Sequence, residues 1–156
     1  MAKITIVFGF LLILTGGTSQ GKKDLTREAM RRCGARILLD APPVIPGKTM
    51  AFGRKGSTPF FILPGNPKAI RTLYEVFVKR CLHIIAGREP LGKEQKVPLP
   101  EAFRKPGGVI SLVPVLLGHR EEAVARMYPA EPNGFIVLEG KQDLIPAGTL
   151  VKVLEP

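Results

Sequence analysis

An unbroken apolar run from Ile4 to Leu14 leads directly into a glycine-rich segment, residues 15–24, and then into an amphipathic pattern from Leu25. A run that is apolar at every position is typical of a strand covered on both faces of a parallel sheet. The glycine-rich segment is therefore interpreted as a turn between a buried strand and a helix. This strand–turn–helix order predicts an α/β domain, and it constrains the fold more than any other feature of the chain.

The same run also resembles the apolar part of a signal peptide. It is too short to cross a bilayer, and no small-residue cleavage pattern follows it. The only cysteines, Cys33 and Cys81, lie far apart in predicted helices, and we expect both to be reduced and buried. These features predict a cytoplasmic protein that does not engage a membrane.

The glycine-rich segment has the composition of an anion-binding turn. Gly16, Gly17 and Gly21 allow the backbone to approach a ligand closely, and the following helix N-terminus offers unpaired N–H groups. Two lysines add positive charge, and Asp24 stands where either a helix N-cap or a metal-binding carboxylate would stand. A plain strand-to-helix turn remains the alternative interpretation of the segment taken alone.

The pattern after this turn predicts a helix over residues 24–33, ended by Gly34, and a short strand over residues 35–40. Strand, helix and strand form a βαβ-like unit, which predicts a parallel pairing of the two strands. The expected buried face of the helix is the set Leu25, Ala29 and Cys33.

Residues 41–48 contain three prolines, so we expect a stiff irregular loop that places Lys48. Short strands are predicted over residues 49–54 and 59–63, with a hairpin turn at residues 55–57.

A second glycine turn, Leu63–Pro67, opens a helix that is expected to reach Ala86. Asn66 is a suitable N-cap, and Pro67 suits the first helical position. The expected core stripe of this helix is Ile70, Leu73, Phe77, Cys81 and Ile84. A pocket at the carboxyl ends of the strands, rimmed by two helix N-termini, is the usual ligand site of an open α/β sheet.

The composition changes after residue 88, so two domains are expected, 1–88 and 89–156. Beyond the boundary the pattern predicts only strands, separated by Pro, Gly and Asn turns, which favours a small all-β barrel or sandwich. The predicted strands are residues 97–99, 109–117, 123–128, 134–138 and 148–154.

The formal net charge of +10 favours an anionic partner, either a small phosphate compound or nucleic acid. The basic residues are dispersed, aromatic residues make up only 6% of the chain, and tryptophan is absent. Stacking surfaces for single strands are therefore scarce, which disfavours nucleic acid.

Three segments in order, together with the C-terminal tail, resemble the molybdopterin molybdenumtransferase family. The segments are Thr15–Asp24, Pro46–Gly53 and Leu63–Pro67, and the tail is Gly134–Gly148. The resemblance covers nearly the whole chain from about Leu11. It implies a partial three-layer α/β molybdopterin-binding domain followed by the family's small C-terminal β domain.

The resemblance also implies a chemistry, in which molybdate is inserted into adenylylated molybdopterin with Mg²⁺ present and AMP is released. Asp24 matches a functionally important acid of the family, for which a metal-site role is expected, and Lys48 matches a basic residue of the pocket; these two form the implied catalytic set. The implied cofactor-binding set is Gly16, Gly17, Thr18, Ser19, Gly21, Pro64, Gly65, Asn66 and Pro67.

The chain departs from the family pattern in two ways. Ile45 stands where the family has a lysine, and the family's N-terminal domains have no counterpart here. A homodimer or a partner chain that supplies the missing half is therefore one expectation, and a non-catalytic molybdopterin-binding module is another. The related adenylyltransferase family has glycine where this chain has Ser19, which argues against that third function.

Overall fold

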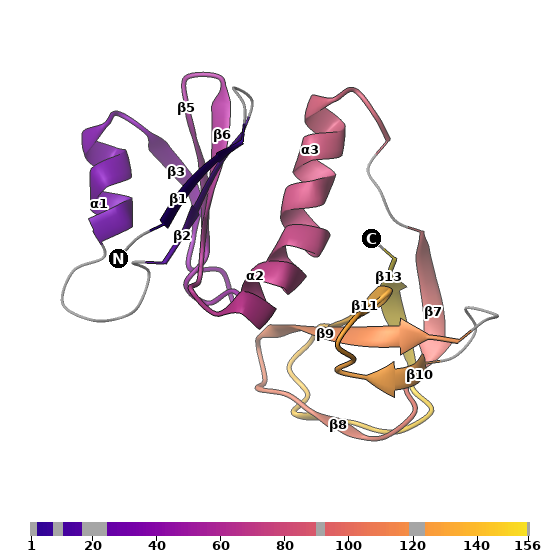
Figure 1. Cartoon of the computed structure of the whole chain (residues 1–156). Helices are drawn as coiled ribbons and strands as arrows, with labels where there is room; N and C mark the ends of the chain where they lie inside the picture. Colours follow the sequence, from indigo (N-terminus) through magenta and orange to yellow (C-terminus); the bar gives the residue numbers. More distant parts are fainter. Residues whose placement is uncertain (1–2, 8–10, 17–24, 90–92, 119–123, 156) are drawn as a thin grey trace. The chain divides into compact units, whose positions relative to one another are not determined.

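The computed structural model describes residues 3–7, 11–16, 25–89, 93–118 and 124–155. The chain divides into two compact units. The first comprises Met1–Pro42 and Gly47–Gly87, and the second comprises Pro43–Pro46 and Arg88–Pro156. Figure 1 shows that helices and strands alternate in the first unit, whereas strands dominate the second. The expected order, an α/β domain followed by a small β domain, is confirmed.

The first unit is built on a five-stranded mixed sheet with the strand order β1-β2-β6-β5-β3. Its strands are β1 (Lys3–Val7), β2 (Leu11–Thr15), β3 (Arg36–Asp40), β5 (Ala51–Lys55) and β6 (Thr58–Leu63). The central pair, β2 and β6, is parallel, and all other pairs are antiparallel. The predicted hairpin is confirmed, with Gly56 in the left-handed conformation at its turn (φ 57°).

The interpretation of Ile4–Leu14 as one buried strand is wrong. The run contains two strands, β1 and β2, which pair antiparallel from Lys3 opposite Thr15 to Val7 opposite Leu11. Hydrophobic periodicity carries no signal for a reversal of direction within a run that is apolar at every position.

The predicted parallel pairing of the two βαβ strands is also wrong. The strand after the first helix, β3, pairs antiparallel with β5 at the end of the sheet, and the parallel neighbour of β2 is β6. The strands β2 and β3 still run in the same direction, but β6 and β5 lie between them. Local sequence predicts that a right-handed helical connection joins two strands of the same direction. It does not predict how many other strands lie between them in the sheet.

The first helix, α1 (Leu25–Arg32), has the predicted bounds, but its predicted buried face is wrong. Leu25 is 59% exposed, and Ala29 and Cys33 are exposed as well. The helix instead turns Arg27 (7% exposed) and Met30 inward, and Met30 packs on Leu14, Ala35, Ala51, Phe60 and Ile62. A pattern of apolar residues could not anticipate a buried arginine, because arginine is buried only where specific partners satisfy it.

The second predicted helix is one continuous helical segment in three parts. These are α2 (Pro67–Leu73), a π-helical turn η1 (Tyr74–Val78) and α3 (Lys79–Ile85). The helices α1 and α2–α3 lie on opposite sides of the sheet, which gives the three layers of the unit (Figure 1). Leu73, Val76 and Val78 are buried, but Ile84 is 62% exposed, so the predicted core stripe fails at its end. The π turn changes the residue spacing that a 3.6-residue period assumes.

The second unit is a β domain around one apolar core. Its main sheet has the order β10-β9-β11-β13-β7, and the two-residue strand β4 (Val44–Ile45) pairs with β9 in parallel. The strands are β7 (Glu94–Pro98), β9 (Ile110–Leu117), β10 (Val124–Met127), β11 (Gly134–Leu138) and β13 (Leu150–Leu154). All five correspond to predicted strands.

Three short strands of this unit were not predicted. A small second sheet pairs β8 (Phe103–Arg104) with β12 (Leu144–Ile145), and it packs Phe103 and Ile145 against the core. The strand β4 lies inside the segment that was expected to be an irregular loop. Strands of two residues are too short to show any periodicity.

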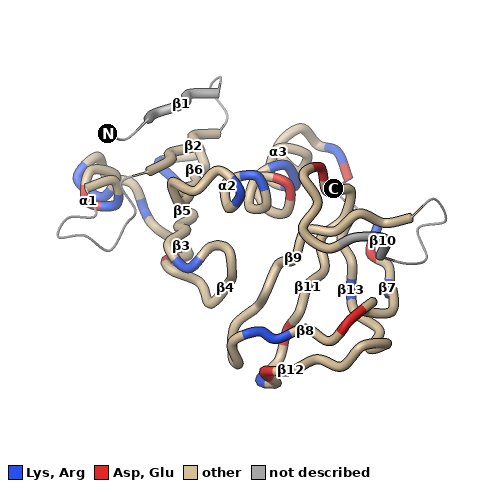
Figure 2. The backbone as a smooth tube through the Cα atoms, turned by 60° about the horizontal axis from the view of Figure 1, so that its bottom comes forward, with Lys and Arg blue, Asp and Glu red and all other residues tan. Residues whose placement is uncertain are grey.

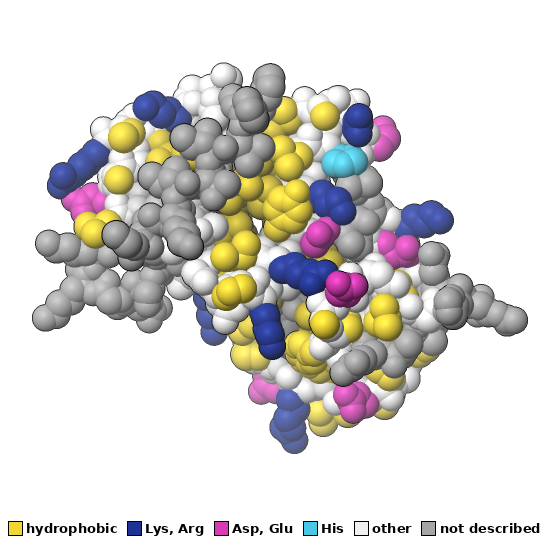
Figure 3. Space-filling view, in the orientation of Figure 1, with side chains coloured by type: hydrophobic (Ala, Val, Ile, Leu, Met, Phe, Trp, Pro, Cys, Tyr) yellow, Lys and Arg dark blue, Asp and Glu magenta, His cyan; other side chains and the backbone are white. Residues whose placement is uncertain are grey.

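The surface of the first unit carries several large apolar side chains, some of which are visible in Figure 3. The most exposed are Leu25 and Leu38 near α1 and β3, and Ile84 on α3. Within the described part of the chain, no helix has the length and apolar character needed to span a membrane.

The backbone approach at Gly53 gives a first prediction. A Cβ atom at this position would lie 2.3 Å from the Arg36 carbonyl oxygen and 2.5 Å from Phe60 Cζ. We expect Gly53→Ala to lower the free energy of unfolding by about 3 kcal/mol, because neither the strand backbone nor a buried ring can yield. Urea denaturation followed by circular dichroism measures this change.

Gly56→Ala in the adjoining turn is the matched control. No atom lies within 4 Å of a Cβ there, so only the left-handed backbone opposes the substitution. Its expected cost is about 1 kcal/mol. Equal effects of the two substitutions would contradict the proposed steric conflict at Gly53.

Candidate functional site

The parallel pair β2–β6 brings Gly16, at the start of the glycine-rich segment, next to the second glycine turn. Thr15 lies opposite Leu63 at the carboxyl ends of the strands, and the Gly16 N–H donates to the Leu63 carbonyl at 3.4 Å. A Cβ on Gly65 would lie only 3.7 Å from the Gly16 Cα, so the two chain segments are in contact just beyond the sheet. Gly16 has a φ of 82°, a conformation that favours glycine.

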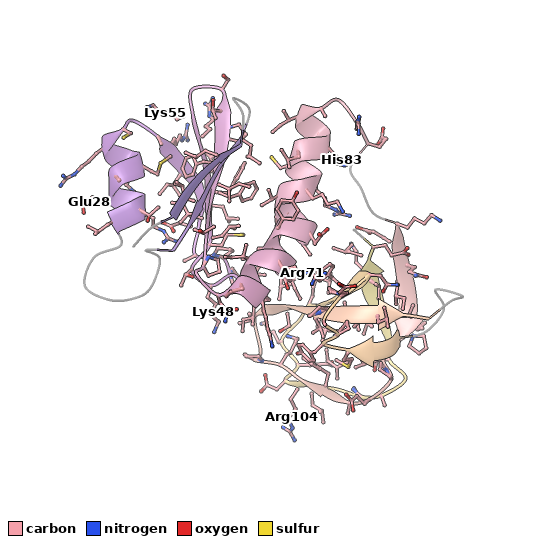
Figure 4. All side chains as sticks on the ribbon, viewed as in Figure 1. Glu28, Lys48, Lys55, Arg71, His83 and Arg104 are labelled. Carbon is pink, nitrogen blue, oxygen red and sulfur yellow. The ribbon has the colours of Figure 1, made fainter. Side chains whose placement is uncertain are left out.

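The turn that carries Lys48 lies at the same edge of the sheet. Three residues later β5 begins, with Ala51 opposite Ile62 near the end of β6. The Met50 N–H donates to the Gly47 carbonyl at 2.8 Å and closes the turn. Figure 4 shows Lys48 at the end of the sheet where α2 begins. Its side chain is exposed, and within the described part of the chain its ammonium has no hydrogen-bond or ion-pair partner.

The Pro64–Pro67 turn shapes the backbone and leaves few free donors. Asn66 Oδ1 accepts from the Lys68 N–H at 2.9 Å and from the Ala69 N–H at 3.3 Å. The Ile70 N–H donates to the Asn66 carbonyl, and Pro67 has no N–H. The cap thus uses the amides of the first helical turn, so this helix N-terminus does not offer them to an anion as the sequence pattern indicated.

One cation at this edge was missed from the sequence. Lys68 is exposed in the first turn of α2, which contains no acidic residue. A positive charge there opposes the helix dipole and is unfavourable unless an anion is nearby. Basic residues on α2 are visible in Figure 2. The signal was present in the sequence, since Lys68 directly follows the proline that begins the helix.

The first turn of α1 ties these pieces to one another. Thr26 Oγ1 donates to the Gly16 carbonyl at 3.3 Å. Arg27 Nη2 donates to the Thr49 carbonyl at 3.0 Å and to the Met50 carbonyl at 3.3 Å. Two consecutive residues of one helix therefore hold the end of β2 and the turn that carries Lys48.

Five of the predicted site residues lie outside the described residues. They are Gly17, Thr18, Ser19, Gly21 and Asp24. The other six, Gly16, Lys48, Pro64, Gly65, Asn66 and Pro67, lie at one edge of the sheet of the first unit. Their roles toward a ligand stay predictions.

The described residues provide no acidic cluster for a metal ion. Across these ranges, no three His, Cys, Asp or Glu side chains are arranged to hold one. Asp40, at the same edge of the sheet, has one carboxylate oxygen 2.6 Å from Arg27 Nε and the other 3.1 Å from Arg31 Nη2. The described part of the site therefore does not fit Mg²⁺, and Asp24 is the one predicted ligand that the sequence offers.

The cysteines also differ from expectation. Cys33 is exposed, not buried, and Cys81 is half-buried on α3. Burial raises the pKa of the Cys81 thiol, which lowers its thiolate fraction at neutral pH. Neither lies at the glycine edge. The described residues of this edge offer exposed cationic side chains and a close approach of glycine backbone, an arrangement that suits an anion.

Comparison with known proteins agrees with this geometry. A family profile described as "Probable molybdopterin binding domain" matches residues 6–83. Molybdopterin molybdenumtransferase from Bacillus subtilis is 27% identical over 155 residues, which cover 92% of this chain and 36% of that protein. Molybdopterin molybdenumtransferase 2 from Mycobacterium tuberculosis is 25% identical over 158 residues, covering 92% of this chain and 39% of that protein.

The fold is also similar to that of solved structures. A molybdopterin biosynthesis MoeA protein from Pyrococcus horikosii superposes with a TM-score of 0.74 at 20% sequence identity, over 95% of this chain and 37% of that one. The chain thus spans little more than a third of the length of these relatives. With half of its residues matched by this profile, the chain belongs to the family described as a probable molybdopterin binding domain.

Proposed function

We propose that this chain binds adenylylated molybdopterin at the shared edge of β2 and β6 and acts in molybdenum cofactor biosynthesis, at the step where molybdate is inserted and AMP is released. The observation that carries the proposal is the contact between Gly16 and Gly65 at the same sheet edge as Lys48, which is exposed and has no partner among the described residues. Names of the matched relatives support the same pathway.

The chemistry of this ligand suits the edge. Adenylylated molybdopterin carries phosphate groups, and molybdate is itself an oxyanion. Glycine turns allow phosphate oxygens to approach backbone N–H groups. Lys48 and Lys68 provide positive charge, while Asp40 at the same edge is already paired with Arg27 and Arg31. The edge thus offers positive charge to an anion from cations on two different chain segments.

The length of the chain bears on how much of the activity it performs. Relatives are more than twice as long, so we propose that this chain supplies the substrate-binding part of the site. A second copy or a partner chain would supply the rest.

Magnesium and cellular location belong to the same proposal. Mg²⁺ prefers carboxylate and phosphate oxygens, so Asp24 together with the substrate phosphates would hold it. We propose that the protein works in the cytoplasm, which suits a chain with two unpaired thiols.

The central experiment is an equilibrium titration of the purified chain with adenylylated molybdopterin in the presence of Mg²⁺, followed by addition of molybdate and measurement of AMP. We expect saturable binding with little AMP release by the chain alone. Absence of binding would refute the proposed function. If that result came with affinity for nucleic acid that falls linearly in the logarithm of salt concentration, a basic nucleic-acid binder would replace it.

Lys48→Gln tests the cation at the site. We expect the dissociation constant for adenylylated molybdopterin to rise about tenfold, since a charge-assisted contact to an anion is lost. The same titration measures it, and the thermal midpoint should not change, because the side chain is exposed.

Lys55→Gln is the matched control for Lys48. Lys55 is equally exposed, but it lies at the opposite end of β5, paired with Thr58 at the start of β6 (Figure 4). Its loss should leave the dissociation constant within about twofold of the wild-type value, because screening weakens the interaction of distant exposed charges. A similar loss of affinity in both variants would show that net charge alone drives binding.

Asp24→Asn tests the predicted acid. If Asp24 helps to hold Mg²⁺, the variant should bind normally without the metal and lose the metal-dependent part of the affinity, with folding retained. Titrations with and without Mg²⁺ measure this difference. Equal affinity of variant and wild type in Mg²⁺ would reduce the carboxylate to a helix cap.

A further inference from the structure

Arg27 is the most deeply buried charged side chain near the site, yet the sequence pattern gave it no role. Its side chain is 9% exposed, and its guanidinium contacts three residues in two separate segments of the first unit. Nε donates to Asp40 Oδ1 at the end of β3, and Nη2 donates to the carbonyls of Thr49 and Met50. The two carbonyls follow Lys48 directly in the chain.

We propose that Arg27 is a positioning residue that fixes the turn carrying Lys48 against the start of α1. The expected effect of Arg27 on ligand affinity rests on the proposed function. The anchoring of the turn by Arg27 does not, because it depends only on contacts within the first unit. Arg27 acts through backbone carbonyls and is not itself assigned a contact with substrate.

The backbone around the turn requires such an anchor. Met50 O accepts from Arg27 Nη2 and also from the Ala41 N–H at 2.9 Å. Ala41 adopts a left-handed conformation (φ 47°), which is sterically disfavoured for a residue with a Cβ. Asp40, the residue before it, is held by Arg27. One guanidinium thus contacts both the carboxylate of the residue before Ala41 and the carbonyl that accepts from the Ala41 N–H.

The geometry also explains why an arginine is needed here. A guanidinium offers five N–H donors in a planar fork and keeps its charge when buried. It can therefore reach a carboxylate and two carbonyls at once. A lysine ammonium would keep the charge near Asp40, but it lacks the second, separate donor group that reaches Thr49 and Met50.

The position of Arg27 links two parts of the candidate site. The helix α1 begins at Leu25, directly after Asp24 in the chain, and Arg27 lies in its first turn. Thr26 beside it donates to the Gly16 carbonyl. The start of α1 therefore contacts both Gly16, which follows β2, and the turn that carries Lys48.

Two substitutions and one control test the inference. Arg27→Met removes every donor and keeps an unbranched apolar stem, whereas Arg27→Lys keeps the charge but replaces the planar guanidinium by a single ammonium. Arg31→Met is the control, because Arg31 is exposed and donates to the other oxygen of Asp40 without contacting the turn. Should Arg27→Met fail to fold, Arg27→Lys carries the test.

The first measurement is amide hydrogen exchange. The Ala41 and Met50 amides, which donate to Met50 O and Gly47 O, should exchange at least about tenfold faster in the Arg27 variants, because loss of the anchor permits local opening. In Arg31→Met they should stay within about twofold of wild type. Unchanged exchange in the Arg27 variants would overturn the inference whether or not the chain binds molybdopterin.

The second measurement is the affinity for adenylylated molybdopterin with Mg²⁺. If wild type binds, Arg27→Met should weaken binding about tenfold, and the Lys48→Gln effect should shrink in the Arg27→Met background, since the two act as a unit. Arg31→Met should bind like wild type. Faster exchange with unchanged affinity, or strictly additive effects, would reduce Arg27 to a structural residue and overturn the positioning role.

The two measurements separate the two proposals. If wild type does not bind, the proposed function fails, and the exchange result alone decides whether Arg27 anchors the turn. If wild type binds and Arg27→Met binds equally well, the proposed function stands and the positioning role fails.

Discussion

The parallel pairing of β2 with β6 is the constraint on which the site depends. It sets Thr15 opposite Leu63, and so it brings the glycine that follows β2 into contact with the glycine turn that follows β6. The antiparallel pairing of β5 with β6 then places the Lys48 turn at the same edge. A single register shift between β2 and β6 would separate the turns by a residue and turn inward side chains outward. The site is thus a consequence of strand register more than of any one side chain.

Much of this arrangement could be predicted from the sequence. Turn chemistry identified the Gly56 hairpin and the Asn66 cap with Pro67 at the helix start, because those residues impose local backbone geometry. Apolar segments separated by Pro, Gly and Asn turns identified the five longer strands of the second unit. The resemblance of three short segments led to the family, and the profile match over residues 6–83 confirmed it.

What could not be predicted depends on contacts between distant residues. The apolar run gave no sign of the reversal between β1 and β2, and the crossover gave no sign of the two strands between β2 and β3. Arg27 was assigned to the exposed side of α1 because its burial depends on Asp40 and on two carbonyls more than twenty residues away. For the same reason the prediction wrongly buried Leu25 and Cys33. At helical spacing both residues lie on the side away from Arg27, so a helix that turns Arg27 inward exposes them.

The capping of α2 changes how anion recognition at this edge must work. A helix N-terminus attracts anions when its first N–H groups are free, but here Asn66 accepts from two of them and Pro67 has none. In the proposed function, recognition of an anion would therefore rest on cationic side chains and glycine backbone, not on the N-terminus of α2. A lysine that contacts a bound anion loses side-chain entropy, and any ordering of the backbone that carries it adds to that cost. Because the buried guanidinium of Arg27 contacts the backbone directly after Lys48, in the proposed function only the lysine side chain would remain to be ordered when an anion binds.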